Sequence, residues 1–480
     1  MKKNQSKLIM MILSLAFILL FQFVPAPAGL TSTSMQVIGI FIGIMLMWNF
    51  IGIDWPSFLC MAILAAFQIM KPAEIFKSGF GNATIAFLMV FFMMSYTLSQ
   101  VGLSRRLAVW FFTNKLAQKS PWMFVTMFLF GAMVMASFMS QTAALLIFLP
   151  IAEQIFKELE YEKGDRFPQM LVLGLGISVG IGSANTPLGH AIILIPIQLL
   201  QEQTGLSVNI IAYSAFGIAT GLLIFTALIL VYRFLYHPDL NKLANYDATK
   251  LRNDLPPMSK QEKIAAGLFA GVIAVWILQG FLKNIIPAAG GYLAGLGNAV
   301  PVMIAIIIMC VIEVDGKPIM NYKDAATHGV PWSALIFNSA VLVLSGALVL
   351  DNVGISKFLI KNVTPLVSGM NQTVFILAIA TLCIVMTNFA SNTVCATVFY
   401  TISAPIALAM GNINMVALAS LIGAAASYAF ATPPSTMPMA VVASSGWVDM
   451  KVMFKYGGLI ALISIAMLAF VGYPIAAAVL

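Results

Sequence analysis

Two stretches of this chain repeat one another. Residues 135–142 read Met-Ala-Ser-Phe-Met-Ser-Gln-Thr, and residues 386–393 read Met-Thr-Asn-Phe-Ala-Ser-Asn-Thr. The flanks repeat as well, because Gln-Val-Gly-Leu-Ser at 100–104 matches Asn-Val-Gly-Ile-Ser at 352–356, and a Thr-Pro pair follows each motif. Two similar halves, each with a polar triplet inside an apolar stretch, are typical of secondary transporters that build one substrate site at the bilayer midplane.

The composition places these repeats in a membrane. Of the 480 residues, 61% are hydrophobic and 9% are charged, whereas a soluble globular protein carries about 25% charged residues. The many long apolar stretches predict an all-α polytopic membrane protein. The net charge of +8 does not indicate a nucleic-acid partner, because the basic residues lie in short loops and at helix ends. The four cysteines lack C-x-x-C spacing and are interpreted as small buried hydrophobic residues.

The basic loops predict the topology. Lys and Arg gather in 104–119, 157–166 and 237–263, whereas 25–34 and 473–480 carry no charge. We therefore expect a multi-pass protein of the plasma membrane with a cytoplasmic N-terminus and an extracellular C-terminus. That orientation requires an odd number of crossings, which about 11 transmembrane helices plus two re-entrant hairpins satisfy. The candidate spans are roughly 7–24, 35–50, 52–70, 83–103, 121–137, 169–182, 207–235, 264–283, 295–313, 331–350, 373–389, 412–431 and 455–478.

The two triplets open segments that differ from ordinary crossings. Segments 138–152 and 391–407 are short, apolar after the triplet, and reach a proline, which favours re-entrant hairpins. An odd number of spans in each half makes the halves inverted repeats, so the triplets would meet near the middle of the bilayer. The basic start and apolar run of the first helix also resemble a signal peptide, but the many spans that follow favour a retained helix.

The triplets themselves offer uncharged hydrogen-bond donors. Amides and hydroxyls at a hairpin tip can bind a carboxylate, and the N-terminus of the following helix adds partial positive charge. Side-chain oxygens and unwound carbonyls also suit a hard cation such as sodium. The alternative is a small-polar helix-packing patch, which two matched copies disfavour. The triplet residues are Ser140, Gln141, Thr142, Ser391, Asn392 and Thr393.

Breaks in two helices and one histidine complete the candidate site. Proline removes a backbone donor, so the Thr-Pro pairs at 186–187 and 432–433 predict broken helices at 183–190 and 432–438. His190 adjoins the first break, and an ionisable residue at membrane depth is a functional candidate. It could sense protons, bind anion or replace a bound cation, or it could be a hydrogen-bonded wall residue.

No catalytic constellation accompanies this site. The sequence holds no H-E-x-x-H, P-loop or G-x-S-x-G motif and no paired intramembrane Asp. We therefore expect no enzyme activity and no cofactor other than sodium ions as coupling partners. An anion channel is a weaker alternative, because the two tips would close the path rather than line it.

The paired motif resembles that of the divalent anion:sodium symporter (DASS) family, the INDY-type dicarboxylate transporters. The resemblance covers nearly the whole chain and implies a homodimer in which a transport domain moves like an elevator against a scaffold. It assigns scaffold helices to 1–137 and 264–389, a polar linker to 236–263, and hairpin, broken helix and last transport-domain helix to 138–235 and 390–480. It implies substrate contacts at Ser140, Gln141, Thr142, Ser391, Asn392, Thr393, Ser183, Thr432 and Pro433, and a cation site or its replacement at Ser140, Gly182, His190, Ser391, Asn392 and Ala431.

Two departures from the family pattern fall on the first half. Gln141 stands where the family usually has Asn, and the first break ends Thr-Pro-Leu-Gly-His190 where sodium-coupled members tend to end Pro-Pro-Asn. A histidine there can supply the charge that sodium would otherwise provide. We therefore expect cation-independent exchange of C4–C5 dicarboxylates such as malate, succinate and 2-oxoglutarate, with sodium-coupled di- or tricarboxylate or sulfate symport as the alternative.

Overall fold

The computed structural model describes residues 2–246, 252–253, 255–350, 352–355, 358, 361–362 and 370–480. The described helices of the first half are α1 (Lys2–Leu20), α2 (Ser32–Phe50), α3 (Trp55–Ala66), α4 (Pro72–Ser78), α5 (Ala83–Gln100), α6 (Leu103–Thr113), α7 (Pro121–Ala136), α8 (Gln141–Glu158), α9 (Arg166–Asn185), α10 (Leu194–Thr204) and α11 (Ile210–Val231). Those of the second half are α13 (Lys260–Ile285), α14 (Pro287–Gly295), α15 (Ala299–Val311), α16 (Tyr322–Asp324), α17 (Trp332–Val349), α19 (Gln372–Thr387), α20 (Asn392–Met410), α21 (Met415–Ala425), α22 (Met437–Ser444), α23 (Met450–Val452), α24 (Gly458–Met467) and α25 (Tyr473–Val479).

One small antiparallel hairpin is the sheet of the described chain. Its strands are β1 (Glu313–Val314) and β2 (Lys317–Pro318). The turn residues Asp315 and Gly316 have positive φ angles of 55° and 73°, which an Asp-Gly pair adopts readily in a two-residue turn.

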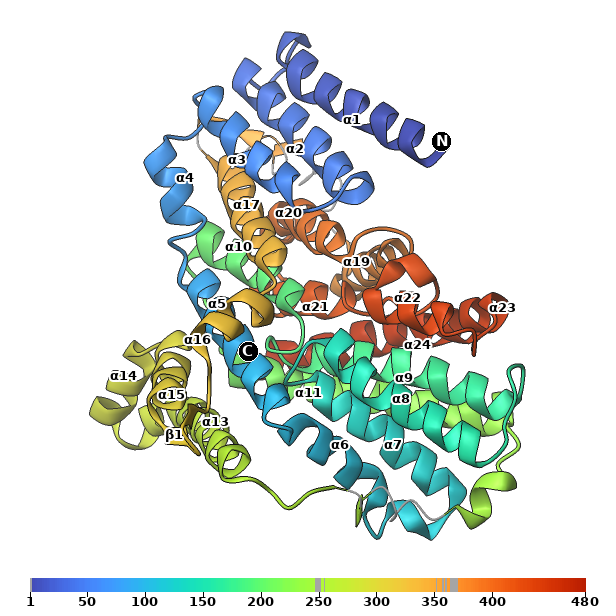
Figure 1. The fold of residues 1–480 in the computed structure, drawn as a ribbon. Helices are drawn as coiled ribbons and strands as arrows, with labels where there is room; N and C mark the ends of the chain where they lie inside the picture. Colours follow the sequence, from blue (N-terminus) through green and yellow to red (C-terminus); the bar gives the residue numbers. More distant parts are fainter. Residues whose placement is uncertain are drawn as a thin grey trace.

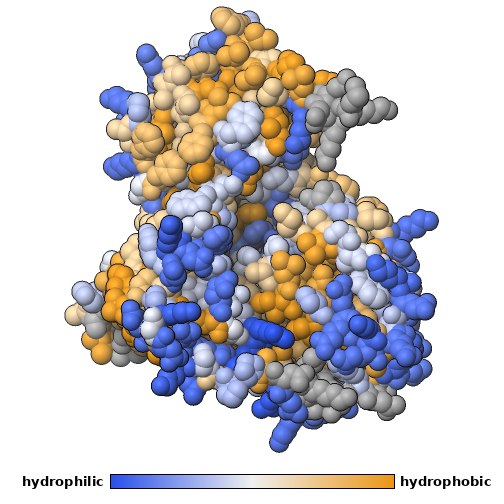
Figure 2. Space-filling view, viewed as in Figure 1, coloured by the Kyte–Doolittle hydropathy of each residue, from blue (hydrophilic) through white to orange (hydrophobic). Residues whose placement is uncertain are grey.

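The helices have the length and surface of membrane spans. Seven helices of the described residues are long and apolar enough to cross a bilayer, and an eighth counts if the bent pair Tyr322–Gly329 and Trp332–Leu348 is one span. Apolar residues cover much of the face drawn in Figure 2, and Ile9, Phe234 and Leu462 are each more than half exposed. Exposed apolar area on this scale fits lipid rather than water. The predicted all-α polytopic membrane fold is confirmed, while the count of 11 crossings stays a prediction.

The helices form two bodies on either side of a hollow. Helices α1 to α3 lie at one end of the molecule with α17 and α20, and α7, α8, α9 and α11 lie together at the other end (Figure 1). The space-filling view is hollowed near the middle of this face, between the two bodies (Figure 2). On this face many hydrophilic residues gather at the end that holds α6 and α7 (Figures 1 and 2).

Helices α7 and α8 are the two arms of one hairpin. The ring centroids of Phe128 on α7 and Phe148 on α8 lie 5.2 Å apart, and residues 137–140 form the tip between the helices. The sequence had assigned 121–137 to a separate crossing and 138–152 to the hairpin. In the structure the first arm is the whole of α7, and α19 and α20 stand in the same relation around residues 388–391. The domain boundaries stay a prediction.

The repeated flanks adopt the same backbone conformation. Gly102 before α6 has a φ of 92°, and Gly354 in the second half has a φ of 71°. This left-handed conformation costs glycine little, because glycine has no Cβ. The repeat therefore marks equivalent turns, although its last residue, Ser356, lies outside the described residues.

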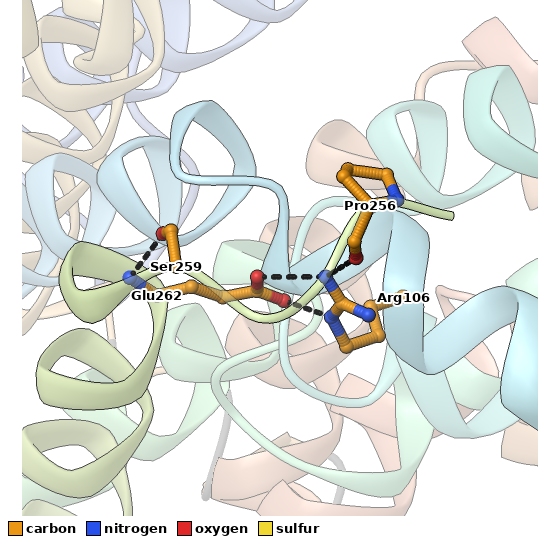
Figure 3. A network of polar contacts seen from close by, with 4 residues as sticks. All are labelled: Arg106, Pro256, Ser259 and Glu262. Atoms are coloured by element: carbon orange, nitrogen blue, oxygen red, sulfur yellow. Dashed lines mark hydrogen bonds and ion pairs between the residues drawn. The ribbon is translucent and has the colours of Figure 1, made fainter. Parts of the chain in front are cut away.

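A bidentate ion pair fastens the linker to the first half. Arg106 Nε lies 2.5 Å from Glu262 Oε1, and its Nη2 lies 3.0 Å from Oε2 and 2.8 Å from the Pro256 carbonyl oxygen (Figure 3). The Ser259 hydroxyl accepts from the Glu262 N–H at 3.0 Å. The hydrogen bond to Glu262 raises the pKa of the Arg106 guanidinium. The end of the predicted linker 236–263 is thus anchored to α6, while its residues 247–251 and 254 lie outside the described residues.

Candidate functional site

The two triplets lie at the hairpin tips, where helices α8 and α20 begin. The Ser140 hydroxyl accepts from the Ala143 N–H at 3.2 Å, so it caps α8. The Ser391 N–H donates to Asn49 Oδ1 of α2 at 3.0 Å. Both Thr142 and Thr393 are half-buried in the first turn of their helices. Free N–H groups at such helix starts favour an anion.

The two helix breaks bind the hairpin arms in the same way. Helix α9 ends at Asn185, and the Thr186 hydroxyl donates to the carbonyl oxygen of Ser137. Helix α21 ends at Ala425, and the Thr432 hydroxyl donates to the carbonyl oxygen of Asn388. Ser137 and Asn388 occupy the same position in the repeated motif. Each Thr-Pro pair therefore attaches its break to the arm that leads into its own tip.

Asn388 organises the second break. Its Oδ1 accepts from the backbone N–H groups of Phe430 at 2.8 Å and Ala431 at 2.7 Å. Its Nδ2 donates to the carbonyl oxygens of Ile384 at 2.7 Å and Tyr428 at 3.2 Å. Three of these bonds satisfy backbone groups that follow the end of α21, which membrane-buried backbone requires, and the fourth goes to α19. The sequence interpretation missed Asn388, although its place inside the repeat was a usable signal.

Asn185 makes the corresponding hydrogen bonds at the first break. With its oxygen accepting from Ser137 Oγ at 3.1 Å, its nitrogen donates to the Ile181 carbonyl at 3.2 Å and to the Gly217 carbonyl at 3.1 Å. A Cβ on Gly221 of α11 would lie 2.0 Å from the end of the Asn185 side-chain amide. Helix α11 therefore needs glycine at this point so that its backbone can approach the break.

His190 joins the two halves of the site. Its Nε2 lies 3.3 Å from Gln141 Nε2 at the first tip. Its Nδ1 lies 2.9 Å from Ser427 Oγ at the second break. The predicted candidates Gln141 and His190 are thus brought together, and Ser427 is a residue that the sequence interpretation missed. Nothing in the spacing of the chain indicated this contact, because it crosses from one repeat to the other.

The other predicted residues take different places. Asn392 Oδ1 accepts from the Thr387 hydroxyl at 2.8 Å. The Ser183 hydroxyl is fully buried and donates within its own helix to the Gly180 carbonyl at 2.8 Å. Gly182 packs so closely on α7 that a Cβ would lie 2.0 Å from the Met133 carbonyl oxygen. Pro433 is half-buried beside Thr432, and Ala431 uses its N–H to bind Asn388. Their predicted contacts with substrate or cation stay predictions.

The described site contains no cluster of His, Cys, Asp or Glu side chains that could bind a metal ion. No group of three or more His, Cys, Asp or Glu side chains within the described ranges could hold a metal ion. The polar groups at the tips and breaks are instead hydroxyls, amides and backbone carbonyls. Their oxygens suit a hard monovalent cation, whereas their hydroxyl and amide N–H groups can donate hydrogen bonds to an organic anion.

An all-α membrane fold, with two polar hairpin tips set against two broken helices, defines a polytopic membrane transporter. The model of the family described as "Sodium:sulfate symporter transmembrane region" matches residues 5–477. The chain belongs to this family of DASS transporters.

Curated relatives agree with this assignment. The chain is 25% identical over 473 residues to the sodium-dependent dicarboxylate transporter SdcS of Staphylococcus saprophyticus, covering 95% of this chain and 88% of the relative. It is also 27% identical over 343 residues to an uncharacterized transporter of Haemophilus influenzae, covering 71% and 70% of the two chains.

Solved structures share the fold at low sequence identity. The chain is similar to Neisseria gonorrhoeae MtrF, with a TM-score of 0.55, 15% identity, and coverage of 85% of this chain and 84% of that chain. It is also similar to the Alcanivorax borkumensis YdaH transporter, with a TM-score of 0.57, 10% identity, and coverage of 92% and 98%.

Proposed function

We propose that this protein exchanges C4–C5 dicarboxylates such as malate, succinate and 2-oxoglutarate across the plasma membrane without coupling to a cation. The observation that carries the proposal is the bridge that His190 makes between Gln141 and Ser427. Transport follows alternating access, in which the hairpins and broken helices move together like an elevator against the remaining helices.

The two tips bind the two carboxylates of the substrate. Thr142 and Thr393 each place a half-buried hydroxyl in the first turn of a helix, where the helix N-terminus favours negative charge. Asn392 is buried at the second tip with its side-chain oxygen 2.8 Å from the Thr387 hydroxyl, and in this proposal its amide N–H groups donate to a carboxylate. Ser140, Gln141 and Ser391 complete the tips, while Ser183, Thr432 and Pro433 line the breaks opposite them.

His190 takes the structural place of a cation in the first half. A cation at such a site would hold the tip and the breaks together through its oxygen ligands. The imidazole ring does this by hydrogen bonds, at 3.3 Å to Gln141 and at 2.9 Å to Ser427. The corresponding cation-lining positions are Ser140 and Gly182 in the first half, with Ser391, Asn392 and Ala431 in the second.

Sodium-driven symport is the second candidate function. The relative SdcS, which the chain matches over 95% of its length, is named as a sodium-dependent dicarboxylate transporter. Hydroxyl and carbonyl oxygens at the second tip would then bind sodium ions, and inward sodium movement would drive uptake.

The basic loops support a cytoplasmic N-terminus and an extracellular C-terminus. Lys163 binds the Ser445 carbonyl at 3.3 Å, Lys242 binds the Glu160 carbonyl at 2.7 Å, and Arg166 binds the Tyr236 carbonyl. Loops that are far apart in the chain thus bring their positive charges to one end of the hairpin helices. The positive-inside rule assigns such an end to the cytoplasm. We further propose a homodimer, the arrangement that the family resemblance implies.

The test is uptake of labelled malate and 2-oxoglutarate into proteoliposomes under four conditions. An inward sodium gradient is present or absent, and unlabelled dicarboxylate is present or absent inside. The proposal predicts uptake that needs internal dicarboxylate and ignores sodium. Sodium-driven uptake into vesicles without internal dicarboxylate would establish symport instead, and no saturable uptake under any condition would refute both candidates.

A further inference from the structure

His190 belongs to a series of hydrogen bonds that runs from Gln141 to Ser427. The backbone carbonyl of Gly423 determines which atom of each pair is the donor. Helix α21 ends at Ala425, and the Ser427 N–H bonds to the carbonyl of Ala424. The Gly423 carbonyl one residue earlier therefore does not receive this N–H. The Ser427 hydroxyl donates to it instead, at 3.1 Å. The hydroxyl proton of Ser427 is thus committed to Gly423, and its oxygen is left to accept.

The acceptor role of Ser427 fixes the tautomer of His190. Ser427 Oγ lies 2.9 Å from His190 Nδ1, so the proton of a neutral ring is on Nδ1. His190 Nε2 is then an acceptor, and Gln141 Nε2 lies 3.3 Å from it as the donor. No carboxylate of the described residues pairs with this ring, and both of its partners are uncharged. Neutral imidazole with one donor and one acceptor nitrogen satisfies both contacts.

The chain of bonds ends at an oxygen that has no partner. Gln141 uses its nitrogen for His190, and its Oε1 is buried without a hydrogen-bond partner among the described residues. Gln141 is 9% exposed, so bulk water does not satisfy this oxygen, and an unpaired buried acceptor is costly. Its neighbours Ser140 and Thr142 are exposed and half-buried at the tip. The first tip therefore presents an acceptor beside the donors of its own helix start.

We infer that Gln141 Oε1 accepts a hydrogen bond from a hydroxyl group on the substrate, and that Ser427 is the positioning residue that keeps this oxygen free. The inference rests on the proposed function and narrows its substrate class. A carboxylate has no proton to give and is repelled by an amide oxygen, whereas the hydroxyl of a 2-hydroxy dicarboxylate donates to it. The protein then prefers malate to succinate, which has the same two carboxylates and lacks the hydroxyl.

Replacing Ser427 is expected to exchange the donor and acceptor roles of His190 and Gln141, which gives a specific test. In Ser427→Ala, Nδ1 loses its acceptor, so the ring proton can move to Nε2 and bond to Gln141 Oε1. The amide then turns its nitrogen towards the substrate, and the hydroxyl of malate loses its acceptor. Ser427→Thr restores a hydroxyl and with it the wild-type direction. Ser420→Ala is the matched control, because Ser420 is a fully buried serine on α21, the helix that ends two residues before Ser427, and takes no part in these hydrogen bonds.

The experiment measures how well unlabelled malate and succinate compete with labelled malate for uptake into dicarboxylate-loaded proteoliposomes. The wild type and Ser420→Ala should show half-inhibition at about tenfold less malate than succinate, the ratio expected for one hydrogen bond of ordinary strength. In Ser427→Ala the ratio should fall to about one, and Ser427→Thr should recover the wild-type ratio.

Four results would overturn the inference. Equal competition by malate and succinate in the wild type would overturn this inference but not the proposed dicarboxylate transport. This comparison does not depend on the folding of any variant. If active Ser427→Ala still prefers malate to succinate, Ser427 is not the positioning residue. A malate preference that exists only with sodium present would assign the free oxygen to a cation. Uptake of no dicarboxylate at all would reject the proposed function as well.

Discussion

Asn388→Ala is expected to weaken the second break more than any ordinary buried amide substitution. The change removes the acceptor of two backbone N–H groups, on Phe430 and Ala431, and the donor to the Tyr428 carbonyl. Asn388 is 3% exposed, so water does not replace these bonds. A buried donor left without a partner costs about 1–3 kcal/mol. The membrane-embedded unfolded state also finds partners, so the two N–H groups together cost about 2–4 kcal/mol.

The assay is thermal unfolding of the purified protein in detergent, followed by the loss of monodisperse protein, with transport measured on the same samples. The matched control is Asn338→Ala, because Asn338 is 4% exposed and its nitrogen makes one hydrogen bond, to the Ala334 carbonyl at 2.7 Å. Asn388→Asp keeps an acceptor for both N–H groups and should lose less stability than Asn388→Ala. If Asn388→Ala unfolds at the same temperature as Asn338→Ala, the break does not depend on this side chain.

Three further predictions concern the site and its anchor. Asn392→Ala and Thr142→Ala should each lower uptake by about 5- to 150-fold in protein that still folds, because each removes a donor worth about 1–3 kcal/mol to a desolvated carboxylate; normal uptake by both would remove the site assignment. His190→Asn should make uptake depend on sodium, measured as uptake with and without a gradient, whereas unchanged behaviour would leave His190 as a wall residue. Arg106→Leu should destabilise the protein by about 3–5 kcal/mol because it strands the buried Glu262 carboxylate, and adding Glu262→Leu should recover most of the melting temperature; a double variant no more stable than the single one would contradict this account.

The sequence predicted the local parts of the site better than their contacts. The tips at Ser140 and Ser391 and the breaks at Thr186 and Thr432 follow from rules that act along the chain, since polar triplets cap helices and proline ends them. The DASS resemblance and the all-α membrane fold were confirmed as well. The roles of the tip residues stay predictions.

The contacts between repeats could not be read from the chain. Ser427 binds His190 across more than two hundred residues, and no spacing rule connects them. Ser137 and Asn388 were within reach, because a polar residue at the same place in both copies of an apolar motif indicates a shared contact. The assignment of 121–137 to a separate crossing arose because an arm of a hairpin and a short span have the same length and apolarity.

Each repeat has one asparagine between its hairpin arm and its helix break, but on different segments. In the first repeat it is Asn185 of the break, and in the second it is Asn388 of the arm. When the halves are aligned on their Thr-Pro pairs, Ser137 of the first arm faces Asn185, whereas Asn388 of the second arm faces Ala431. In each repeat an asparagine contacts a smaller residue. The smaller residue lies on the arm in the first repeat and on the break in the second. The two repeats therefore carry this pair of residues in opposite order, so we expect that neither arm can be grafted into the other half unless its break is exchanged with it.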